Sequence, residues 1–409
     1  MATDRSPSPP PDADGAAPDP LAGDITARYR ALADLRAGAG HVATGMGRYF
    51  ATEEAVRQGL REVDRFVGSM VDTSALPPDE VILPAVPEPE HGRLRAVVNS
   101  VIAARHLDGV LPFVRETAAD LVAAAVAAAS GGRPVDLVEA LADPLPTVVI
   151  AHVLGVSADD RDRFRVWSDE LLAAQGRASD GDLARAHPEF AAYVQREIDR
   201  RRAAADPPDD VITRLIRSES AEGARLSDAA VRTQTMFLIV AGNETTRNLI
   251  GNCLRTLAER PDLYAAVRAD PALVAVVVEE SLRHDSPVQI LARQALRDGS
   301  LGGCPVARGE RVVFGIASAN RDEACHADAD TFRLDRPYPR DHLAFGTGAH
   351  VCPGAALARA EATALLHELC GQVESLNLAT DFVARPNPVF WALGQRSLPC
   401  VVTPAGEAG

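Results

Sequence analysis

The chain has 409 residues, which is enough for one large domain or two ordinary ones, and its 46% hydrophobic and 24% charged residues are typical of a globular protein. The formal net charge of -15 argues against a general nucleic-acid binder, which needs a basic surface. No apolar run approaches the roughly 20 residues that span a bilayer, and the N-terminus has no signal-peptide pattern, so we expect a cytoplasmic protein without a membrane anchor.

The cysteines are scattered along the chain without the close pairs that a structural zinc site uses. In a reducing cytoplasm a disulfide framework is not expected either. Most of them are therefore expected to be ordinary buried thiols. They are Cys253, Cys304, Cys325, Cys352, Cys370 and Cys400.

The N-terminal part begins with residues 1–22, a Ser/Pro-rich stretch that predicts a disordered tail. Short helical stretches and turn-rich pieces alternate from residue 27 to residue 147. Within them, residues 72–90 carry five prolines and predict a long loop, which is often a functional feature of a compact domain. His91 and Arg95 follow directly after this loop.

The middle of the chain is mostly helical by its apolar spacing. A loop is expected at residues 176–181, and Pro207 and Pro208 are expected to end the helix before them. The expected helices cover residues 115–129, 136–153, 158–174 and 189–205.

A long helix is predicted to begin after Ser227, a good N-cap residue, and to run to about Glu259. A helix of about 30 residues usually crosses the middle of a domain. Ala241 and Thr245 lie on one face of it, where small residues leave room beside the helix. The Thr245 hydroxyl is able to bond the carbonyl of Ala241 and loosen the helix locally.

The C-terminal third begins with a predicted helix over 271–283, capped by Asp270, whose Glu280 and Arg283 share a face. Strand-like pieces follow over 291–314, and an irregular stretch covers 319–345. A last helix is predicted over 355–369, and strands and turns over 375–402. The fold class is therefore mainly α with a small β-rich part.

A glycine-rich segment, residues 345–354, directly precedes the last predicted helix. Its glycines allow a sharp turn and a close approach to a flat group. Cys352 lies at the N-terminal end of that helix, where the helix dipole and free N–H groups favour a thiolate. A thiolate in such a turn is able to serve as the single axial ligand of a heme iron.

This segment is similar to the heme-binding signature of the cytochrome P450 family, Phe-Gly-x-Gly-x-His-x-Cys-x-Gly, at every fixed position. Ala241 to Thr246 resembles the oxygen-binding segment of the same family. Glu280 with Arg283 resembles its Glu-x-x-Arg pair. The matches occur in the family's order over residues 25–402. The resemblance implies a single heme domain over residues 23–405, with the long helix crossing over the heme.

The resemblance also implies roles for particular residues. Cys352 would hold the heme iron, and Glu244 and Thr245 would deliver protons during oxygen activation. Glu280 and Arg283 would be structural. The other heme-contacting positions, of which the histidines and arginines would bind the propionates, are His91, Arg95, Ala241, Arg293, Phe345, Gly346, His350 and Gly354.

Family positions that line the substrate pocket are mainly apolar in this chain, although each of these residues could instead simply fill the core. They predict a hydrophobic, mid-sized substrate such as a terpenoid, a steroid or a polyketide intermediate. The positions are Leu83, Val86, Phe237, Val240, Val288, Ile290 and Phe390.

The function implied is a monooxygenase of natural-product (secondary) metabolism or of terpenoid or steroid oxidation, with heme b (iron protoporphyrin IX) and O₂ as co-substrate. The chain shows no flavin- or nicotinamide-binding motif, so a separate ferredoxin and ferredoxin reductase are expected to supply electrons. Oxidative coupling, desaturation or rearrangement on the same fold stays open. A peroxide-driven enzyme and a non-catalytic gas-binding protein fit less well, because Glu244 and Thr245 are both present.

Overall fold

The computed structural model describes residues 24–406 except 69–72, 74, 75, 103, 158, 159, 175–181, 220–222, 224, 387 and 388. The expected tail, residues 1–22, and the expected loop at 176–181 lie outside the described residues. The α-helices are α1 (Ile25–Ala37), α2 (Glu53–Arg61), α3 (Glu90–Val101), α4 (Ala104–Ala128), α5 (Pro144–Leu154), α6 (Arg161–Ala174), α7 (Leu183–Ala186), α8 (Pro188–Ala203), α9 (Val211–Arg217), α10 (Asp228–Glu259), α11 (Pro261–Ala269), α12 (Leu273–His284), α13 (Ile316–Ala319) and α14 (Ala355–Gln372).

Short strands form three small sheets beside these helices. One sheet has the order β1-β2-β8-β5-β3, a second the order β4-β10-β9, and a third pairs β6 with β7. The strands are β1 (His41–Thr44), β2 (Gly47–Phe50), β3 (Phe66–Gly68), β4 (Val135–Asp136), β5 (Ile290–Ala295), β6 (Gly299–Leu301), β7 (Cys304–Val306), β8 (Arg311–Gly315), β9 (Val373–Leu378) and β10 (Pro399–Pro404).

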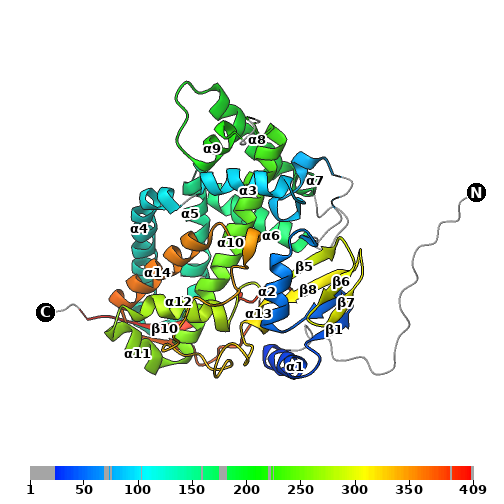
Figure 1. The fold of residues 1–409 in the computed structure, drawn as a ribbon. Helices are drawn as coiled ribbons and strands as arrows, with labels where there is room; N and C mark the ends of the chain where they lie inside the picture. The colour runs from blue at the N-terminus through cyan, green and yellow to red at the C-terminus, as the bar shows by residue number, and fades with distance from the viewer. Residues whose placement is uncertain are drawn as a thin grey trace, which may run out of the picture.

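The long helix α10 runs through the middle of the molecule, with α4 and α14 on one side and the largest sheet on the other (Figure 1). It begins as predicted, because the Ser227 hydroxyl accepts a hydrogen bond from the Ala230 N–H at 3.1 Å. Its C-terminal half packs Leu249, Ile250 and Leu254 into one hydrophobic core with α4, α12 and α14. Its N-terminal half packs into a second core with α6 and α8. Because both halves of α10 are packed into hydrophobic cores, the side chains in the middle of the helix are held in fixed positions.

The largest sheet was not expected in this form, because the sequence pattern predicted helices and turns in the N-terminal part. β1, β2 and β3 come from that part, yet β2 pairs in parallel with β8 and β3 pairs antiparallel with β5. Strands this short carry too few residues for an alternating pattern to stand out. Their partners lie more than 200 residues along the chain, and the pattern within one segment does not indicate which distant segment it pairs with.

The predicted helix over 136–153 is wrong as one element. Val135 and Asp136 form β4, residues Val138–Ala142 form a π-helical turn, and α5 begins at Pro144. Proline lacks an N–H and clashes with the preceding turn, so it suits a helix start and not a helix interior.

Two other helix starts differ from the prediction. The helix expected from residue 115 begins at Ala104 and contains Pro112. The helix expected from Pro271 begins at Leu273. The expected cap at Asp270 is wrong, because Ala272 is the N-cap residue and no side chain caps this helix. The Asp270 carboxylate accepts a hydrogen bond from the Ala272 N–H at 3.1 Å, ahead of the helix. Helix starts are the part of a pattern that periodicity defines least sharply.

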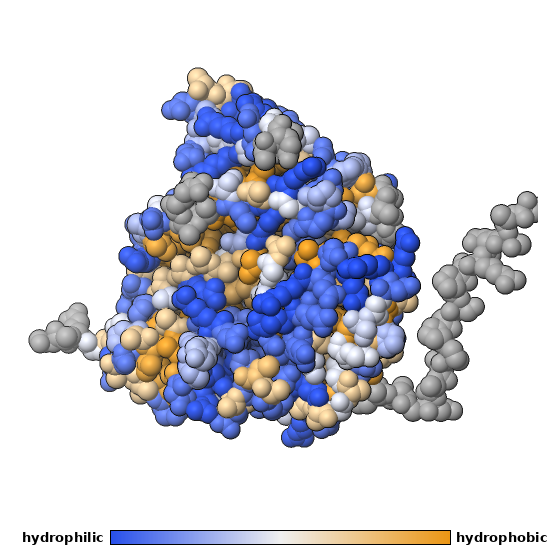
Figure 2. Space-filling view, in the orientation of Figure 1, coloured by the Kyte–Doolittle hydropathy of each residue, from blue (hydrophilic) through white to orange (hydrophobic). Residues whose placement is uncertain are grey.

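Hydrophilic residues cover most of the face seen in Figure 2, with hydrophobic residues in separate patches between them. Among the helices in the described part of the chain, none has both the length and the apolar character of a membrane span.

Candidate functional site

A cavity of about 520 Å³ lies between the middle of α10 and the glycine-rich segment that leads into α14. From α10, Ala241 and Thr245 line it, together with their neighbours Gly242 and Thr246. From the glycine-rich segment the lining residues are Phe345, Gly346, His350, Cys352, Pro353 and Gly354. The two segments that carried the strongest sequence signals thus face one another across one space.

The turn that carries Cys352 is built by backbone hydrogen bonds. The Cys352 N–H donates to the Phe345 carbonyl at 2.8 Å, which closes the segment into a loop. Gly346 and Gly348 have φ values of 70° and 73°, so both need glycine. Gly354 has an ordinary φ of -85°, so the turn itself does not require glycine there.

The Cys352 thiol lies within this turn and is partly buried. Burial raises the pKa of the Cys352 thiol, and the backbone N–H groups of Gly354 and Ala355 together with Arg95 act in the opposite direction without overcoming it. The expectation that the helix start alone favours a thiolate is therefore incomplete. A metal cation at the sulfur would ionise such a thiol outright.

A cationic and aromatic group of side chains lies beside the cysteine. His91 is fully buried, and its Nδ1 lies 2.8 Å from Glu88. Its ring lies against that of His350, with centroids 3.9 Å apart and an angle of 31° between the ring planes. Arg95 donates a hydrogen bond to the carbonyl of Val351. The Arg95 Nε and His91 Nε2 atoms are buried without a hydrogen-bond partner.

Arg293, on β5, completes this group. Its guanidinium bonds the Ala292 carbonyl at 2.9 Å, and no carboxylate among the described residues pairs with it or with Arg95. Burial lowers the pKa of Arg293 to about 10. Burial, and the nearby charges of Arg293, His91 and Arg95, lower the pKa of His350 to about 3. Buried positive charge without a counter-charge is costly, so the site favours an anionic ligand.

Thr245 and Glu244 point in different directions. The Thr245 hydroxyl donates to the Ala241 carbonyl at 2.8 Å, as predicted, and lines the cavity. Glu244 is 2% exposed and does not line the cavity. Its carboxylate accepts a hydrogen bond from Asn248 at 2.9 Å and pairs with Arg247 at 2.5 Å. The two neighbours in sequence are therefore not brought together at the cavity wall.

Three of the predicted pocket residues, Leu83, Phe237 and Val288, line the cavity. Val86 does not, because it packs with Val81 and Leu94 in a small separate cluster. Val240 does not either, because it lies on the face of α10 that packs into the core with α6 and α8.

Ile290 and Phe390 are also corrections. Successive strand residues point to opposite faces, and on β5 it is Leu291 and Arg293 that line the cavity. Ile290 therefore packs on the other side of the sheet, with Tyr29 and Val313. Phe390 is 43% exposed and lies away from the cavity lining.

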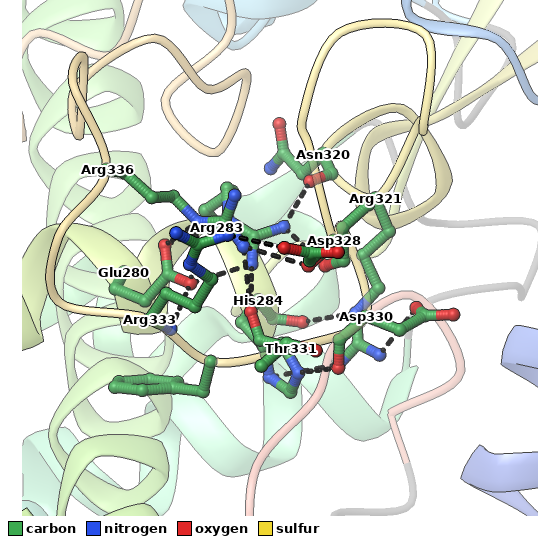
Figure 3. Close-up of polar contacts among 12 residues, drawn as sticks. Glu280, Arg283, His284, Asn320, Arg321, Asp328, Asp330, Thr331, Arg333 and Arg336 are labelled. Carbon is green, nitrogen blue, oxygen red and sulfur yellow. Dashed lines mark hydrogen bonds and ion pairs between the residues drawn. The ribbon is translucent and has the colours of Figure 1, made fainter.

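Glu280 and Arg283 form a buried bidentate ion pair, with N···O distances of 2.8 and 2.9 Å. Arg283 also donates to the carbonyls of Asn320 and Ala329, and Arg336 approaches both oxygens of Glu280 at 2.9 Å (Figure 3). Burial raises the pKa of Glu280, but its bonds and charge contacts with Arg283 outweigh this and lower it. The pair ties α12 to the irregular segment that precedes the cysteine turn.

Glu361, on α14, is a cavity residue that sequence reasoning missed. It is 3% exposed, lines the cavity, and its Oε2 has no hydrogen-bond partner. Burial raises its pKa well above the ordinary value of a glutamate. The residue lies two helical turns beyond the start of α14, and this spacing could have suggested that it shares the cavity face with Leu357 and Ala358.

A family model described as cytochrome P450 matches residues 28–371 of the chain. The chain is 36% identical over 325 residues to cytochrome P450 monooxygenase PikC of Streptomyces venezuelae, which covers 78% of this chain and 76% of the relative. This is a likeness over most of both sequences.

Two solved structures are similar over nearly the whole chain. A mutant of P450 EryK in complex with erythromycin B has a TM-score of 0.83 at 29% identity and covers 94% of this chain and 98% of its own. CYP109E1 from Bacillus megaterium in complex with testosterone has a TM-score of 0.80 at 28% identity, with coverage of 91% and 98%. The fold and the order of its elements are thus shared with these proteins.

Proposed function

This chain belongs to the cytochrome P450 family and is a monooxygenase of the oxidoreductase class, and from that membership we propose that it inserts one oxygen atom of O₂ into a mainly apolar small molecule. The proposed cofactor is heme b, and the proposed iron ligand is the thiolate of Cys352. Residues 23–405 are proposed to form one heme domain. One observation carries the proposal: Cys352 borders the same cavity as Arg95 and Arg293, whose guanidinium groups have no carboxylate partner among the described residues.

The residues around the cavity fit a heme. The Cys352 thiol, Arg95, Arg293 and His350 line the cavity, and His91 lies behind His350. The two arginines are proposed to bind the two propionate groups, because arginine binds carboxylates in a bidentate manner. The unpartnered Arg95 Nε and His91 Nε2 atoms are donors or acceptors that such a ligand would satisfy. When bound, the heme supplies the iron at which O₂ is activated, and a thiolate ligand favours O–O cleavage.

Thr245 and Glu244 are proposed to handle protons. The Thr245 hydroxyl donates its one hydrogen to the Ala241 carbonyl at the cavity wall, so its oxygen is free to accept a hydrogen bond from a bound ligand or water. It is able to donate to that ligand only after it leaves the carbonyl. Glu244 is held one step away by Arg247 and Asn248. We propose that it leaves Arg247 and turns toward Thr245 to pass a proton, so that the acid reaches the cavity only when a proton is needed.

The substrate is proposed to be a terpenoid, steroid or polyketide-derived molecule of natural-product metabolism. Leu83, Phe237, Val288 and Leu291 present apolar side chains to the cavity, in keeping with an apolar ligand. Structural relatives hold erythromycin B and testosterone, and both support a mid-sized ligand.

Electrons are proposed to come from a ferredoxin and a ferredoxin reductase. Val351, the residue before the proposed iron ligand, is 42% exposed, so the molecular surface lies close to the sulfur on this side. A redox partner that docks there would be near the cofactor. Reduction of the protein by a ferredoxin, followed by stopped-flow absorbance, tests this step.

The test of the iron ligand is the reduced carbon monoxide spectrum. Cys352→Ser is expected to lose the thiolate-type Soret band, because a hydroxyl is a poor axial ligand for this state. Cys325→Ser, at an exposed cysteine, is the matched control and should keep the band. Persistence of the band in Cys352→Ser would show that another residue binds the iron.

Oxygen insertion is tested with a panel of steroids and ¹⁸O₂. A product that carries one labelled atom supports insertion. A product without label, formed at the expense of O₂, would replace the proposal with desaturation, coupling or rearrangement on the same site.

A further inference from the structure

The proline-rich segment before α3 forms a wall of the cavity. Its described part, from residue 76 to residue 89, contains two short 3₁₀ turns, Pro78–Glu80 and Leu83–Ala85. Leu83 and Pro84 line the cavity. Backbone hydrogen bonds close each of these turns, such as Val81 N–H to the Pro78 carbonyl and Ala85 N–H to the Ile82 carbonyl. The backbone groups between the two turns are bonded by another element.

Gln234 of α10 supplies two of these bonds. Its Oε1 accepts a hydrogen bond from the Leu83 N–H at 3.0 Å, and its Nε2 donates to the Val81 carbonyl at 2.9 Å. One side-chain amide thus pairs with the segment as a neighbouring strand would. Gln234 is 2% exposed, so water does not compete for these bonds.

Further contacts hold the segment on other sides. The Ser227 hydroxyl donates to the Asp79 carboxylate at 2.6 Å. A Cβ atom at Gly68, on β3, would collide with the Pro84 carbonyl oxygen, so the strand backbone lies directly against the segment. These contacts hold the segment at Asp79 and Pro84, and the Gln234 amide holds the backbone between them, at Val81 and Leu83.

The position of Gln234 on α10 links the wall to the reactive region. Gln234, Leu238, Ala241 and Thr245 follow one another at helical spacing along one face, and the last three line the cavity. A fixed distance along this helix therefore separates Leu83 from the Thr245 hydroxyl.

We propose that Gln234 is a specificity-determining positioning residue, which clamps Leu83 into the cavity and thereby sets the size of ligand that fits beside Thr245. The proposal rests on the proposed function only in taking this cavity as the substrate pocket. An amide is required, because it both accepts from Leu83 and donates to Val81. A carboxylate makes only the first bond, and a thioether makes neither.

The first test is hydrogen exchange of the full-length protein followed by mass spectrometry. Gln234→Met is expected to speed exchange in peptides of residues 76–89 about tenfold, the effect of losing a buried hydrogen bond. Thr235→Val is the matched control, because Thr235 is fully buried on the same helix and its hydroxyl bonds nothing. Unchanged exchange in Gln234→Met overturns the clamp. This readout needs no heme, so it stands apart from a failure of the proposed function.

The second test is ligand size, read from the Soret shift of the heme-loaded protein. Imidazole and 4-phenylimidazole are the probes, since both bind iron but differ by a phenyl ring. Gln234→Met is expected to change the ratio of their dissociation constants about tenfold, while Thr235→Val leaves it alone. Gln234→Glu retains one of the two bonds, so its ratio should lie between those of Gln234→Met and Thr235→Val. This variant replaces Gln234→Met in the test if Gln234→Met does not fold. Equal ratios in all variants overturn the role in specificity.

Discussion

At the scale of single residues, two acids line the cavity, the partly buried Cys352 thiol and the buried Glu361 carboxyl. Burial raises the pKa of both. Cys352 has the N–H groups of Gly354 and Ala355 and the charge of Arg95 to oppose burial, whereas nothing opposes it at Glu361. Glu361 is therefore a neutral acid in the folded protein until the pH is well above its ordinary range.

Glu361→Gln is expected to stabilise the protein at neutral and higher pH. The unfolded chain releases the Glu361 proton near the ordinary pKa, whereas the folded protein holds it to higher pH. Folding stability therefore falls as the pH rises between these two values, by about 1.4 kcal/mol for each pKa unit of separation. Glutamine stays neutral and removes this loss.

Denaturant midpoints at acidic and neutral pH measure the effect. Glu374→Gln, at an exposed position of β9, is the control and should follow the wild type at every pH. If Glu361→Gln shows the same pH dependence as the wild type, Glu361 ionises in the folded protein and lies in a more polar setting than its contacts indicate.

Thr245→Ala is expected to divert electrons from product to hydrogen peroxide. The hydroxyl bonded to Ala241 is a polar group of this helix turn that faces the cavity, and proton transfer by a positioned group contributes about 10²-fold or more. Peroxide released per electron consumed is the measurement. Thr245→Ser keeps a hydroxyl and should restore most of the coupling, whereas equal coupling in both variants would remove Thr245 from the relay.

At the scale of elements, the Glu280–Arg283 pair joins α12 to the segment before the cysteine turn (Figure 3). Arg283→Lys is expected to destabilise the protein by about 3–5 kcal/mol, because lysine cannot make the bidentate pair and the carbonyl bonds together. Arg255→Lys alters a more exposed pair with Glu259 on α10 and should change stability by less than about 0.5 kcal/mol. Urea unfolding compares the two, and similar small losses would mean that the Arg283 network relaxes around lysine.

Elements defined by local chemistry were predictable from the sequence. α10 begins at the Ser227 cap and ends at Glu259, as its pattern indicated. The sheet that joins β2 to β8 was not predictable, because its strands are short and its pairing is between distant segments. Pro144 is a signal for a helix start, but the apolar spacing runs on both sides of it and predicts one helix over 136–153.

In the site too, features set by local sequence were predictable and features set by contacts with other elements were not. Motif residues such as Cys352, His350 and Thr245 border one cavity, because each motif holds its own local geometry. Ile290 was predicted in the pocket, whereas its neighbour Leu291 lines the cavity. An error of one residue along a strand exchanges the two faces. The direction of Glu244 depends on its pairing with Arg247 and Asn248, and rotamer choices of this kind are not written in residue spacing.

At the scale of the whole molecule, the stability of the chain depends on what fills the cavity. Arg293→Met is expected to raise the Tm of the heme-free protein, because it removes a buried charge without a partner. In the heme-loaded protein the same change is expected to lower the Tm, because a partner of the proposed propionate is lost. Calorimetry of the heme-free and heme-loaded proteins measures these two Tm changes, which are expected to have opposite signs.

Arg311→Met, at an exposed arginine of β8, is the control for this comparison. It should shift the two forms alike. A drop in both forms for Arg293→Met would mean that Arg293 stabilises the fold through contacts of its own and is not reserved for a ligand.

The order β1-β2-β8-β5-β3 has a consequence for how the protein is made. During translation β2 and β3 leave the ribosome early, but the strands that complete their sheet, β5 and β8, belong to the last third of the chain. β2 is able to pair at once with β1, but its other edge and the whole of β3 must wait without a partner while most of the polypeptide is still being synthesised. Chaperones that bind nascent chains would be expected to hold this stretch until residue 315 has emerged.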